Sequence, residues 1–340
     1  MRHTEKLAMA VVALLAIPAA ELAAPAARAD QPAPAAGSQH KPTIGYSIYD
    51  LKQPYFQAYL KGVRAGAQKY GFGKVLISNE QSSETDMVSG AEELISQGIS
   101  ALIISPEDPS ALPQVERSAK RAGIPVIIGD VGTAGTYWQA FVESRNADGA
   151  GQAAHYMEQA LADAPKPHEV AVIALRPSTS VRKPRTDGFV DALRNNPDFH
   201  IISIVNGKET VAGGYSAMAA LLAAHPKLEG VYCENDPEAE GASRELLQAH
   251  KNPLKSPVLV GFNGDPPALT LIKEKKLAAD IAQNPYEEGI EAVKAARALL
   301  DHKTPQYTDA AAKIIEVPTQ VVTGANVDKF IAGLKTGQLY

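Results

Sequence analysis

The sequence predicts an α/β protein built from two doubly wound parallel-sheet lobes. From Thr43 onward, short β-branched runs alternate with longer amphipathic stretches, which is the pattern of βαβ units. Most of the runs are almost continuously apolar, as strands buried on both faces of a parallel sheet must be. The alternation occurs twice, with a break near residues 143–146, and this number of strands exceeds one compact mononucleotide-type half.

Four predicted strands, separated by helical patterns, form the first part of the chain. The runs are TIGYSI at 43–48, KVLIS at 74–78, ALIIS at 101–105 and PVIIGD at 125–130. After the first run, apolar side chains recur at i, i+4, i+7 and i+11, namely at Phe56, Leu60, Val63 and Ala67. This spacing predicts one buried face of a helix.

Five further runs follow the break and predict the second lobe. They are EVAVIAL at 169–175, HIISIV at 200–205, EGVYCE at 229–234, PVLVGF at 257–262 and LAADIAQ at 277–283. Beyond them, Ile290, Val293 and Leu300 mark another amphipathic helix. In such sheets ligands bind beyond the carboxyl ends of the strands, and two facing lobes form a cleft there. The residues just after each strand are therefore the candidates for a site.

The composition is that of a soluble globular protein and excludes several classes. The chain has 33 basic and 38 acidic residues, a formal net charge of −5, so it has no basic field for nucleic acid or an anionic membrane. A single cysteine excludes an internal disulfide framework and a cysteine-clustered zinc site. None of the eight histidines forms H-x-H or H-E-x-x-H. We expect no cofactor, no metal site and no catalytic residue.

The first 29 residues are predicted to be a signal peptide. A charged start precedes an apolar segment at 7–20, and Ala27-Arg28-Ala29 forms a small-x-small cleavage site before Asp30. The apolar segment is short for a membrane span, and an uncleaved anchor is the alternative. Residues 30–41 are rich in proline and alanine and are predicted to be a flexible leader. We therefore expect export and cleavage after Ala29.

Seven segments, in a fixed order and spacing, carry a family resemblance over about residues 42–325. They are IGYSIYDLKQPYF (44–56), IISP (103–106), TSVRKPRTDGF (179–189), LLAAHP (221–226), VYCEND (231–236), VGFNGD (260–265) and LAADIAQNP (277–285). In these segments the chain resembles the periplasmic sugar-binding proteins of the ribose-binding, LacI-like type I family. The resemblance implies the periplasmic binding protein type I fold, in which a three-strand hinge joins two lobes that close over a small ligand.

The resemblance also implies a ligand site. The residues that match the family's contacts are Tyr49, Gln53, Tyr55, Phe56, Asp130, Arg185, Asn235, Asn263 and Gln283. By the resemblance, the aromatic pair at Tyr55 and Phe56 sandwiches a sugar ring, and Gln53 bonds hydroxyls. Asp130 accepts two hydroxyl donors, and the planar fork of Arg185 donates to ring or hydroxyl oxygens.

Four positions depart from the ribose-type pattern. Val131 stands where the family has Arg, and Asn263 stands where it has Asp. Tyr49 replaces a small polar residue, and Glu209 falls near a position that is usually aromatic. Two charged side chains that bind the sugar in the family are therefore missing. The identity of the ligand stays open: a sugar other than ribose, a polyol or a different small polar molecule.

Structural roles are open for several of these residues. The adjacent aromatic pair cannot both face one core, so we expect one ring to face the cleft. Asp130 alternatively serves a turn, and Arg185 alternatively is a solvated helix charge. Asp236 is expected to cap the helix that follows it, which leaves Asn235 for the ligand.

The expected function is that of the solute-binding component of an ABC importer, which closes around a sugar or related polyhydroxylated ligand without doing chemistry. One alternative is the same fold signalling its ligand-bound form to a membrane histidine kinase or chemoreceptor. A ligand-responsive DNA repressor shares this core but needs an N-terminal helix-turn-helix, where this chain has its export signal. An exported hydrolase needs a coherent nucleophile–base set, which the sequence lacks.

The expected domains follow from the resemblance. They are the signal peptide (1–29), the leader (30–41), an N-terminal lobe (42–144 plus 284–315) and a C-terminal lobe (145–283 plus 316–340), with crossings near Ser144-Arg145, Gln283-Asn284 and Ile315-Glu316. The expected partners are the small-molecule ligand and an inner-membrane ABC permease or sensor protein, with no nucleic acid. We expect a monomer in the periplasm.

Overall fold

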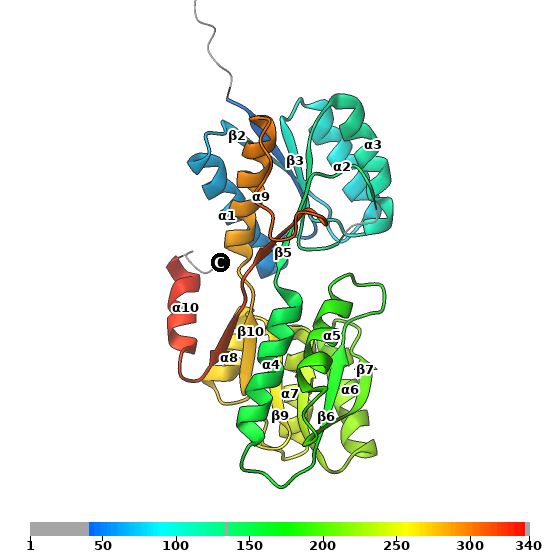
Figure 1. Cartoon of the computed structure of the whole chain (residues 1–340), viewed down its shortest axis with the longest axis vertical. Helices are drawn as coiled ribbons and strands as arrows, with labels where there is room; N and C mark the ends of the chain where they lie inside the picture. The colour runs from blue at the N-terminus through cyan, green and yellow to red at the C-terminus, as the bar shows by residue number, and fades with distance from the viewer. Residues whose placement is uncertain (1–40, 133–134, 337–340) are drawn as a thin grey trace, which may run out of the picture. The chain divides into compact units, whose positions relative to one another are not determined.

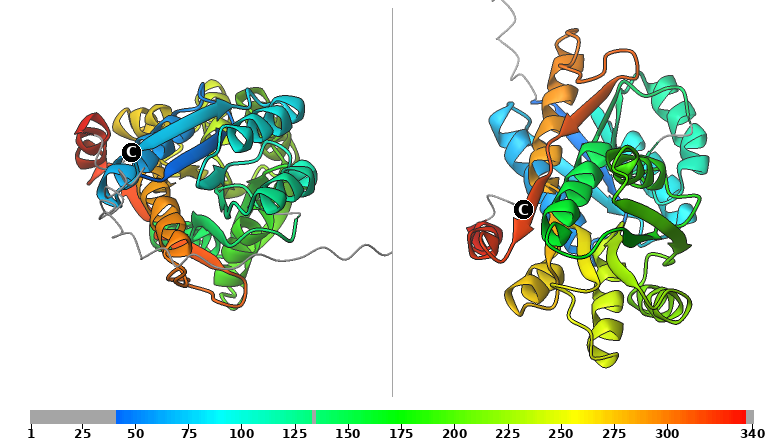
Figure 2. Two further views of the ribbon diagram at one scale, coloured as in Figure 1. Left: turned by 90° about the horizontal axis from the view of Figure 1, so that it is seen from above. Right: turned by 60° about the horizontal axis from the view of Figure 1, so that its bottom comes forward.

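The computed structural model describes residues 41–132 and 135–336. The predicted signal peptide and leader residues 30–40 lie outside this part. Within the described residues, two sheets of six strands organise the chain (Figure 1). Both sheets carry helices on their two faces, which confirms the predicted α/β fold of two doubly wound lobes (Figure 2). Among these residues, no helix combines the length and the apolarity needed to span a membrane.

The first sheet is entirely parallel. Its strands, in spatial order, are β11 (Ile314–Val317), β5 (Ala140–Ser144), β4 (Val126–Gly129), β3 (Ala101–Ile104), β1 (Thr43–Ile48) and β2 (Lys74–Asn79). Helices α1 (Pro54–Lys69) and α9 (Pro285–Leu300) pack on one face, and α2 (Glu84–Ser96) and α3 (Leu112–Ala122) pack on the other. The 3-10 turn η1 (Pro109–Ala111) precedes α3.

The second sheet is parallel except at one edge. Its strands are β12 (Gln320–Thr323), β10 (Ala279–Ala282), β9 (Val258–Asn263), β8 (Leu228–Cys233), β6 (His168–Ala174) and β7 (Phe199–Asn206), with β12 antiparallel to β10. One face carries α4 (Asn146–Leu161) and α5 (Arg182–Leu193). The other face carries α6 (Val211–Ala224), α7 (Asp236–Gln248), α8 (Pro266–Lys273) and α10 (Val327–Thr336).

Each of the nine apolar runs singled out in the sequence forms a strand, with ends that differ by at most two residues. The sequence analysis did not single out β5, β11 and β12. These strands have four or five residues and include polar side chains such as Glu143 and Gln320, so their apolar signal is weak.

Helices α1 and α9 pack against each other unusually closely. A β-carbon added to Gly62 would lie 1.9 Å from the Tyr286 carbonyl oxygen, and one added to Gly289 would lie 2.3 Å from the Tyr59 carbonyl oxygen. Only glycine permits this approach. The predicted apolar face of α1 is buried in the same core, where each fully buried Val, Leu or Phe contributes about 1.5–3 kcal/mol. The glycine contacts bring the first turn of α9 against the start of α1.

The chain passes between the two sheets three times. The passages lie at Arg145, at Gln283-Asn284 and at Pro318-Thr319. The expected boundary between residues 315 and 316 falls inside β11, which pairs with β5 in the first sheet, so the third passage follows that strand. The short apolar pairing of Ile315 and Val317 with β5 is what holds this segment in the first sheet. The division of the remaining residues into two lobes stays a prediction.

Candidate functional site

A cavity of about 780 Å³ lies beyond the carboxyl ends of strands from both sheets. Its walls are segments that follow β1, β3 and β4 in the first sheet and β6 to β10 in the second. All of the predicted site residues line it: Tyr49, Gln53, Tyr55, Phe56, Asp130, Arg185, Asn235, Asn263 and Gln283. A volume of this size is typical of small-molecule sites.

The segment after β1 supplies three aromatic rings. Tyr49 and Phe56 are stacked, with ring centroids 5.2 Å apart and planes 9° from parallel. Tyr55 meets Phe56 edge-on, with centroids 5.1 Å apart. The parallel pair in this loop is therefore Tyr49 with Phe56, rather than Tyr55 with Phe56. Tyr55 and Phe56 are only 6% and 3% exposed and belong to the same apolar core, so the expectation that the adjacent rings cannot share one core is wrong. Gln53 immediately precedes α1, where Pro54 begins the helix, and its exposed amide makes no cap hydrogen bond.

Some of the strained backbone positions of the chain lie at the cavity. Four non-glycine residues that line it have positive φ angles: Asp130 (67°), Lys208 (61°), Glu209 (61°) and Asn263 (142°). Such conformations cost about 1–3 kcal/mol each and cluster at functional sites. Asp130 is held in this conformation by its N–H, which donates to the Val142 carbonyl oxygen at 2.8 Å. The turn therefore directs the Asp130 side chain to the cavity instead of continuing β4.

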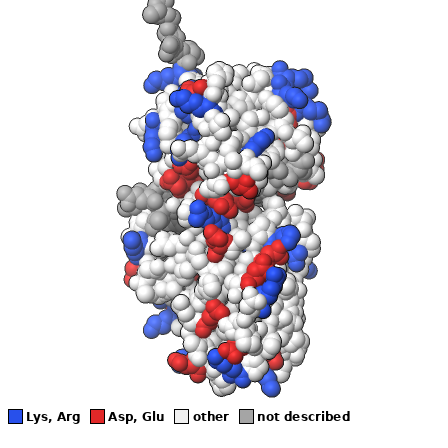
Figure 3. All heavy atoms as spheres, in the orientation of Figure 1, with Lys and Arg blue, Asp and Glu red and all other residues white. Residues whose placement is uncertain are grey.

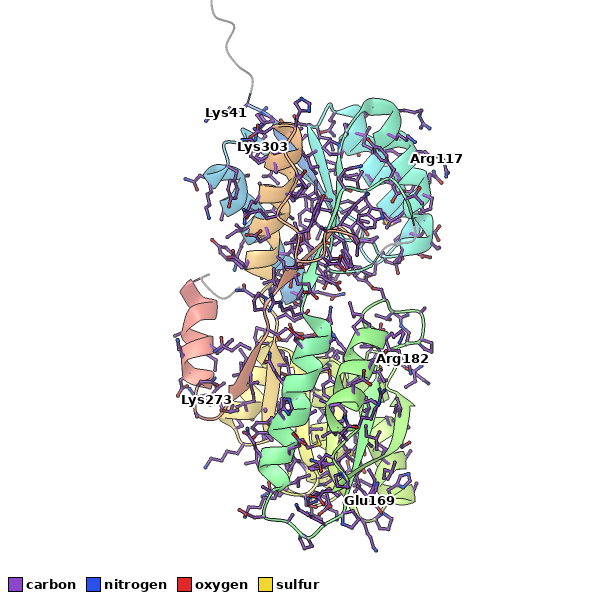
Figure 4. All side chains as sticks on the ribbon, viewed as in Figure 1. Lys41, Arg117, Glu169, Arg182, Lys273 and Lys303 are labelled. Atoms are coloured by element: carbon purple, nitrogen blue, oxygen red, sulfur yellow. The ribbon has the colours of Figure 1, made fainter. Side chains whose placement is uncertain are left out.

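Arg185 is a buried cation held by neutral oxygens. Arg182, labelled in Figure 4, begins α5, and Arg185 lies one turn further along with 3% of its surface exposed. The guanidinium carbon lies 3.9 Å from the centroid of the Phe262 ring. Its hydrogen-bond acceptors are Asn146 Oδ1 (2.9 Å), the Glu234 carbonyl oxygen (2.7 Å), Asn263 Oδ1 (3.3 Å) and Gln283 Oε1 (3.1 Å). This network fixes the direction of the guanidinium without neutralising its charge.

Asn235, and not Asp236, caps α7. Asn235 Oδ1 accepts the Glu238 N–H at 2.9 Å, so the expectation that Asp236 is the cap is wrong. Asp236 is the first residue of the helix, and its Oδ2 accepts the Asp265 N–H at 2.7 Å. Its buried carboxylate thus fixes the loop after β9, while Asn235 both caps the helix and lines the cavity.

Buried carboxyl groups hold the other loops of the cavity. Glu80 Oε2 accepts the Glu107 N–H at 2.8 Å, and Glu80 Oε1 accepts from the Ser47 hydroxyl at 2.7 Å. In the second lobe, Glu238 Oε1 accepts the Glu209 N–H at 3.0 Å. Burial disfavours the charged form and raises the pKa of both Glu80 and Glu238 to about 8. The cavity loops therefore depend on side chains that are neutral near pH 7.

Several cavity residues had no match in the family resemblance. Glu209 lines the cavity, but its carboxylate accepts from Arg176 Nε at 2.9 Å and from the Thr179 hydroxyl. Glu107 and Arg176 also line it, and burial raises the pKa of Glu107. Arg176 lies two residues after β6 and directly after the apolar run 169–175, so its position after a predicted strand was a signal that could have identified it.

A further acidic side chain lines the cavity from the loop after β9. Asp265 lines the cavity, and burial raises its pKa to about 6. Burial also raises the pKa values of Asp236 and Asp280 behind it, and the nearby Asp280 carboxyl raises that of Asp236 further. Within residues 41–132 and 135–336, no group of three or more His, Cys, Asp or Glu side chains is arranged to hold a metal ion.

Comparison with known proteins supports the predicted family. A model described as a periplasmic binding protein domain matches residues 44–304. The ribose import binding protein of Bacillus subtilis is 32% identical over 275 residues, covering 81% of this chain and 87% of that protein. The D-ribose/D-allose-binding protein of Pseudomonas aeruginosa is 27% identical over 297 residues, covering 85% of this chain and 91% of that protein.

Solved structures share the fold. The periplasmic ribose ABC transporter structure from Conexibacter woesei superposes with a TM-score of 0.78 at 21% identity, covering 89% of this chain and 99% of that one. An ABC transporter solute binding protein from Bacillus halodurans with bound myo-inositol gives a TM-score of 0.74 at 22% identity, covering 87% and 99%. With the family model spanning most of the sequence, the chain belongs to the periplasmic binding protein family.

Proposed function

We propose that the protein is the solute-binding component of an ABC importer and that it binds a small sugar or related polyhydroxylated ligand in the cavity between its lobes. By their names, the Bacillus subtilis relative is a ribose import binding protein and the Pseudomonas aeruginosa relative is a D-ribose/D-allose-binding protein; neither name is that of an enzyme. The observation that carries the proposal is that Asp130, from the first lobe, and Arg185, from the second, line one cavity. A ligand that bonds both groups favours the closed arrangement of the lobes.

The chemistry of the cavity suits a molecule with many hydroxyl groups. Carboxylate and amide oxygens accept from hydroxyls, and the Arg185 guanidinium and the side-chain amides donate to hydroxyl or ring oxygens. The half-buried Tyr49 ring, stacked on the buried Phe56, offers an apolar surface of the kind that a sugar ring covers. We propose as ligand contacts Tyr49, Gln53, Tyr55, Phe56, Asp130, Arg185, Asn235, Asn263 and Gln283.

The departures from the ribose-type pattern leave the ligand's identity to experiment. Val131 lines the cavity with an apolar side chain, and Asn263 presents a neutral amide, which accepts from Arg185 at 3.3 Å and from Gln283 Nε2 at 3.0 Å. The site therefore holds fewer charges than the family pattern at these two positions. The ligand screen below therefore includes other pentoses, hexoses and polyols besides ribose.

We favour import over sensing as the role of the protein, because the Bacillus subtilis relative is named an import binding protein. We further propose that the protein is a periplasmic monomer that meets an inner-membrane permease through the outer faces of its lobes. On the face shown in Figure 3, acidic and basic side chains of the described residues are interspersed without a continuous basic surface. This distribution agrees with a small-molecule ligand rather than nucleic acid.

A thermal-shift screen of the mature protein against pentoses, hexoses and polyols tests the proposal. A ligand that binds only the folded protein raises its stability by about 2.7 kcal/mol at a hundredfold excess over Kd. We expect a raised unfolding midpoint with one or a few of these compounds and none with amino acids or nucleotides. A screen in which no sugar or polyol raises the midpoint contradicts the proposed function.

A further inference from the structure

A chain of three side chains leads from helix α9 to the cavity. Tyr55 Oη lies 2.5 Å from Glu288 Oε2, and the same hydroxyl is a hydrogen-bond partner of the Asp130 carboxyl. The Ser144 hydroxyl donates to Glu288 Oε1 at 2.6 Å. Glu288 is 0% exposed, whereas Asp130 lines the cavity. Glu288 is therefore a buried acid that touches the site only through Tyr55.

The number of hydrogens in this chain limits its ionisation. The Tyr55 hydroxyl has one hydrogen, and burial raises the pKa of Tyr55 well above its ordinary value, so the phenol keeps it. That hydrogen can serve Asp130 or Glu288, but not both. With both acids ionised, one carboxylate oxygen would face the phenol oxygen with no hydrogen between them, in a site of low dielectric. One of the two acids must hold a proton.

The surroundings decide which acid holds it. Burial raises the pKa of Asp130, but the Tyr55 hydroxyl and Arg185, across the cavity, both act against this by stabilising its charged form. The titratable and polar groups that face Glu288 are Tyr55 and Tyr59 on α1, Tyr46 on β1, Asp130 after β4, and Glu143 and Ser144 on β5. These groups are neutral or acidic, and burial with the nearby Asp130 charge raises the pKa of Glu288 to about 8.

We propose that Glu288 is protonated at neutral pH and donates a hydrogen bond to the Tyr55 oxygen. The Tyr55 hydroxyl then donates its own hydrogen bond to Asp130, which keeps the Asp130 carboxylate charged and directed at the cavity. Glu288 is thus a positioning residue that acts through Tyr55. Its effect on a ligand rests on the proposed function, whereas the position of the proton does not.

A dependence of binding on pH follows. Above about pH 8, loss of the proton places a second negative charge behind Asp130 and draws the Tyr55 hydrogen towards Glu288. If binding requires the protonated form, Kd at pH 9 should be about tenfold higher than at pH 7, as expected for one proton lost with a pKa near 8. Near pH 8.5 the protein should take up part of a proton as it binds.

The location of the proton is tested first without a sugar, using Glu288→Gln. The glutamine oxygen can accept from Ser144 and its NH₂ can donate to Tyr55, so the variant reproduces the hydrogen bonds of the neutral acid. The matched control is Glu287→Gln, one residue earlier on α9. At pH 6.5, the infrared spectrum of wild type minus that of Glu288→Gln should contain the C=O band of a carboxylic acid. The spectrum of wild type minus that of Glu287→Gln should lack this band. Between pH 5 and 8, unfolding of wild type should involve about one more released proton than unfolding of Glu288→Gln.

The second test measures D-ribose binding by calorimetry at pH 7 and pH 9. Wild type and Glu287→Gln should show the tenfold loss, whereas Glu288→Gln should change by less than about twofold. Wild type alone gives a further readout, because heats measured at pH 8.5 in two buffers of different ionisation enthalpy should differ by the proton taken up.

The outcomes separate the two proposals. If the carboxylic acid band is absent and the free energy of unfolding depends on pH equally in wild type and Glu288→Gln, the proton is not on Glu288 and the proposal is wrong. The same pH profile of D-ribose affinity in wild type and Glu288→Gln would overturn the positioning role. If D-ribose does not bind, the same calorimetry is done with the sugar or polyol that raises the unfolding midpoint most in the screen, and the infrared and unfolding measurements decide the position of the proton in either case.

Discussion

The Gly132 N–H donates to the Ser180 hydroxyl oxygen at 2.8 Å. Gly132 follows β4 of the first sheet and Ser180 precedes α5 of the second, so this hydrogen bond joins the two lobes beside the cavity. A β-carbon added to Gly132 would lie 2.6 Å from the Ser180 β-carbon, so a side chain at this position would push the loops apart. The contact therefore contributes to the arrangement in which both lobes enclose the cavity.

Removal of this contact should weaken ligand binding. Ser180→Ala loses one neutral hydrogen bond, which contributes about 0.5–1.5 kcal/mol, so Kd should rise roughly 2- to 12-fold, mainly through faster dissociation. Stopped-flow kinetics with the ligand from the screen measures both rates. Ser96→Ala, on the surface of α2, is the control and should leave both unchanged. An unchanged dissociation rate in Ser180→Ala would mean that this contact does not stabilise the closed form.

The lobes should close further when a ligand binds. Three short passages connect the sheets, and the lobes otherwise have separate cores, so a hinge motion at these passages requires little repacking. Small-angle scattering of the free and the saturated protein should show a smaller radius of gyration with ligand. An unchanged radius at confirmed saturation would count against hinge closure.

Stability should fall as the pH rises above about 5. Burial raises the pKa values of Glu80 and Glu238 from the ordinary 4.5 to about 8, so the folded state binds more protons than the unfolded state in this range. Their contribution is complete below about pH 4.5 and is lost as the pH passes 8, at about 1.4 kcal/mol per pH unit for each group. Urea unfolding at several pH values measures this slope, and Glu80→Gln should reduce it by about one proton. Stability that increases from pH 5 to pH 8 would show that these acids are ionised in the folded protein.

Export should remove the N-terminal segment. The charged start, the apolar stretch and Ala27-Arg28-Ala29 predict cleavage after Ala29. Intact-mass spectrometry of the periplasmic fraction should find Asp30 at the N-terminus. Material that keeps Met1 in the membrane fraction would support the uncleaved anchor instead.

The sequence predicts the parallel strands well because each is a run of apolar residues, and it predicts the site because ligand groups follow those strands. Asp130, Arg185 and Gln283 are far apart in the sequence, yet strand order places all three at one cavity. The short strands β5 and β11, which border passages between the sheets, escape the same reasoning because each has only four or five residues and includes a glutamate, Glu143 or Glu316.

The burial of Glu288 could not be predicted from the sequence, for a different reason. In the sequence it belongs to an acidic first turn of a helix, a pattern that favours the helix dipole and normally faces solvent. Its burial depends on the close approach of α1 and α9 at Gly62 and Gly289, and sequence periodicity contains no information on that contact. The same holds for Glu80, which joins β1 to the loop after β3.

The central claim is that groups from both lobes bind one polyhydroxylated ligand, and calorimetric titration of Arg185→Met tests it most directly. Methionine keeps an apolar stem against Phe262 but removes the charge and the donors. Lys183→Met is the matched control on α5, since the Lys183 side chain is 83% exposed and pairs with Asp187 on the same helix. A charge-assisted hydrogen bond contributes about 1.5–3 kcal/mol, so Arg185→Met should bind the ligand from the screen roughly 10- to 150-fold more weakly, and Lys183→Met should match wild type. Equal affinities for wild type and a folded Arg185→Met would contradict the claim.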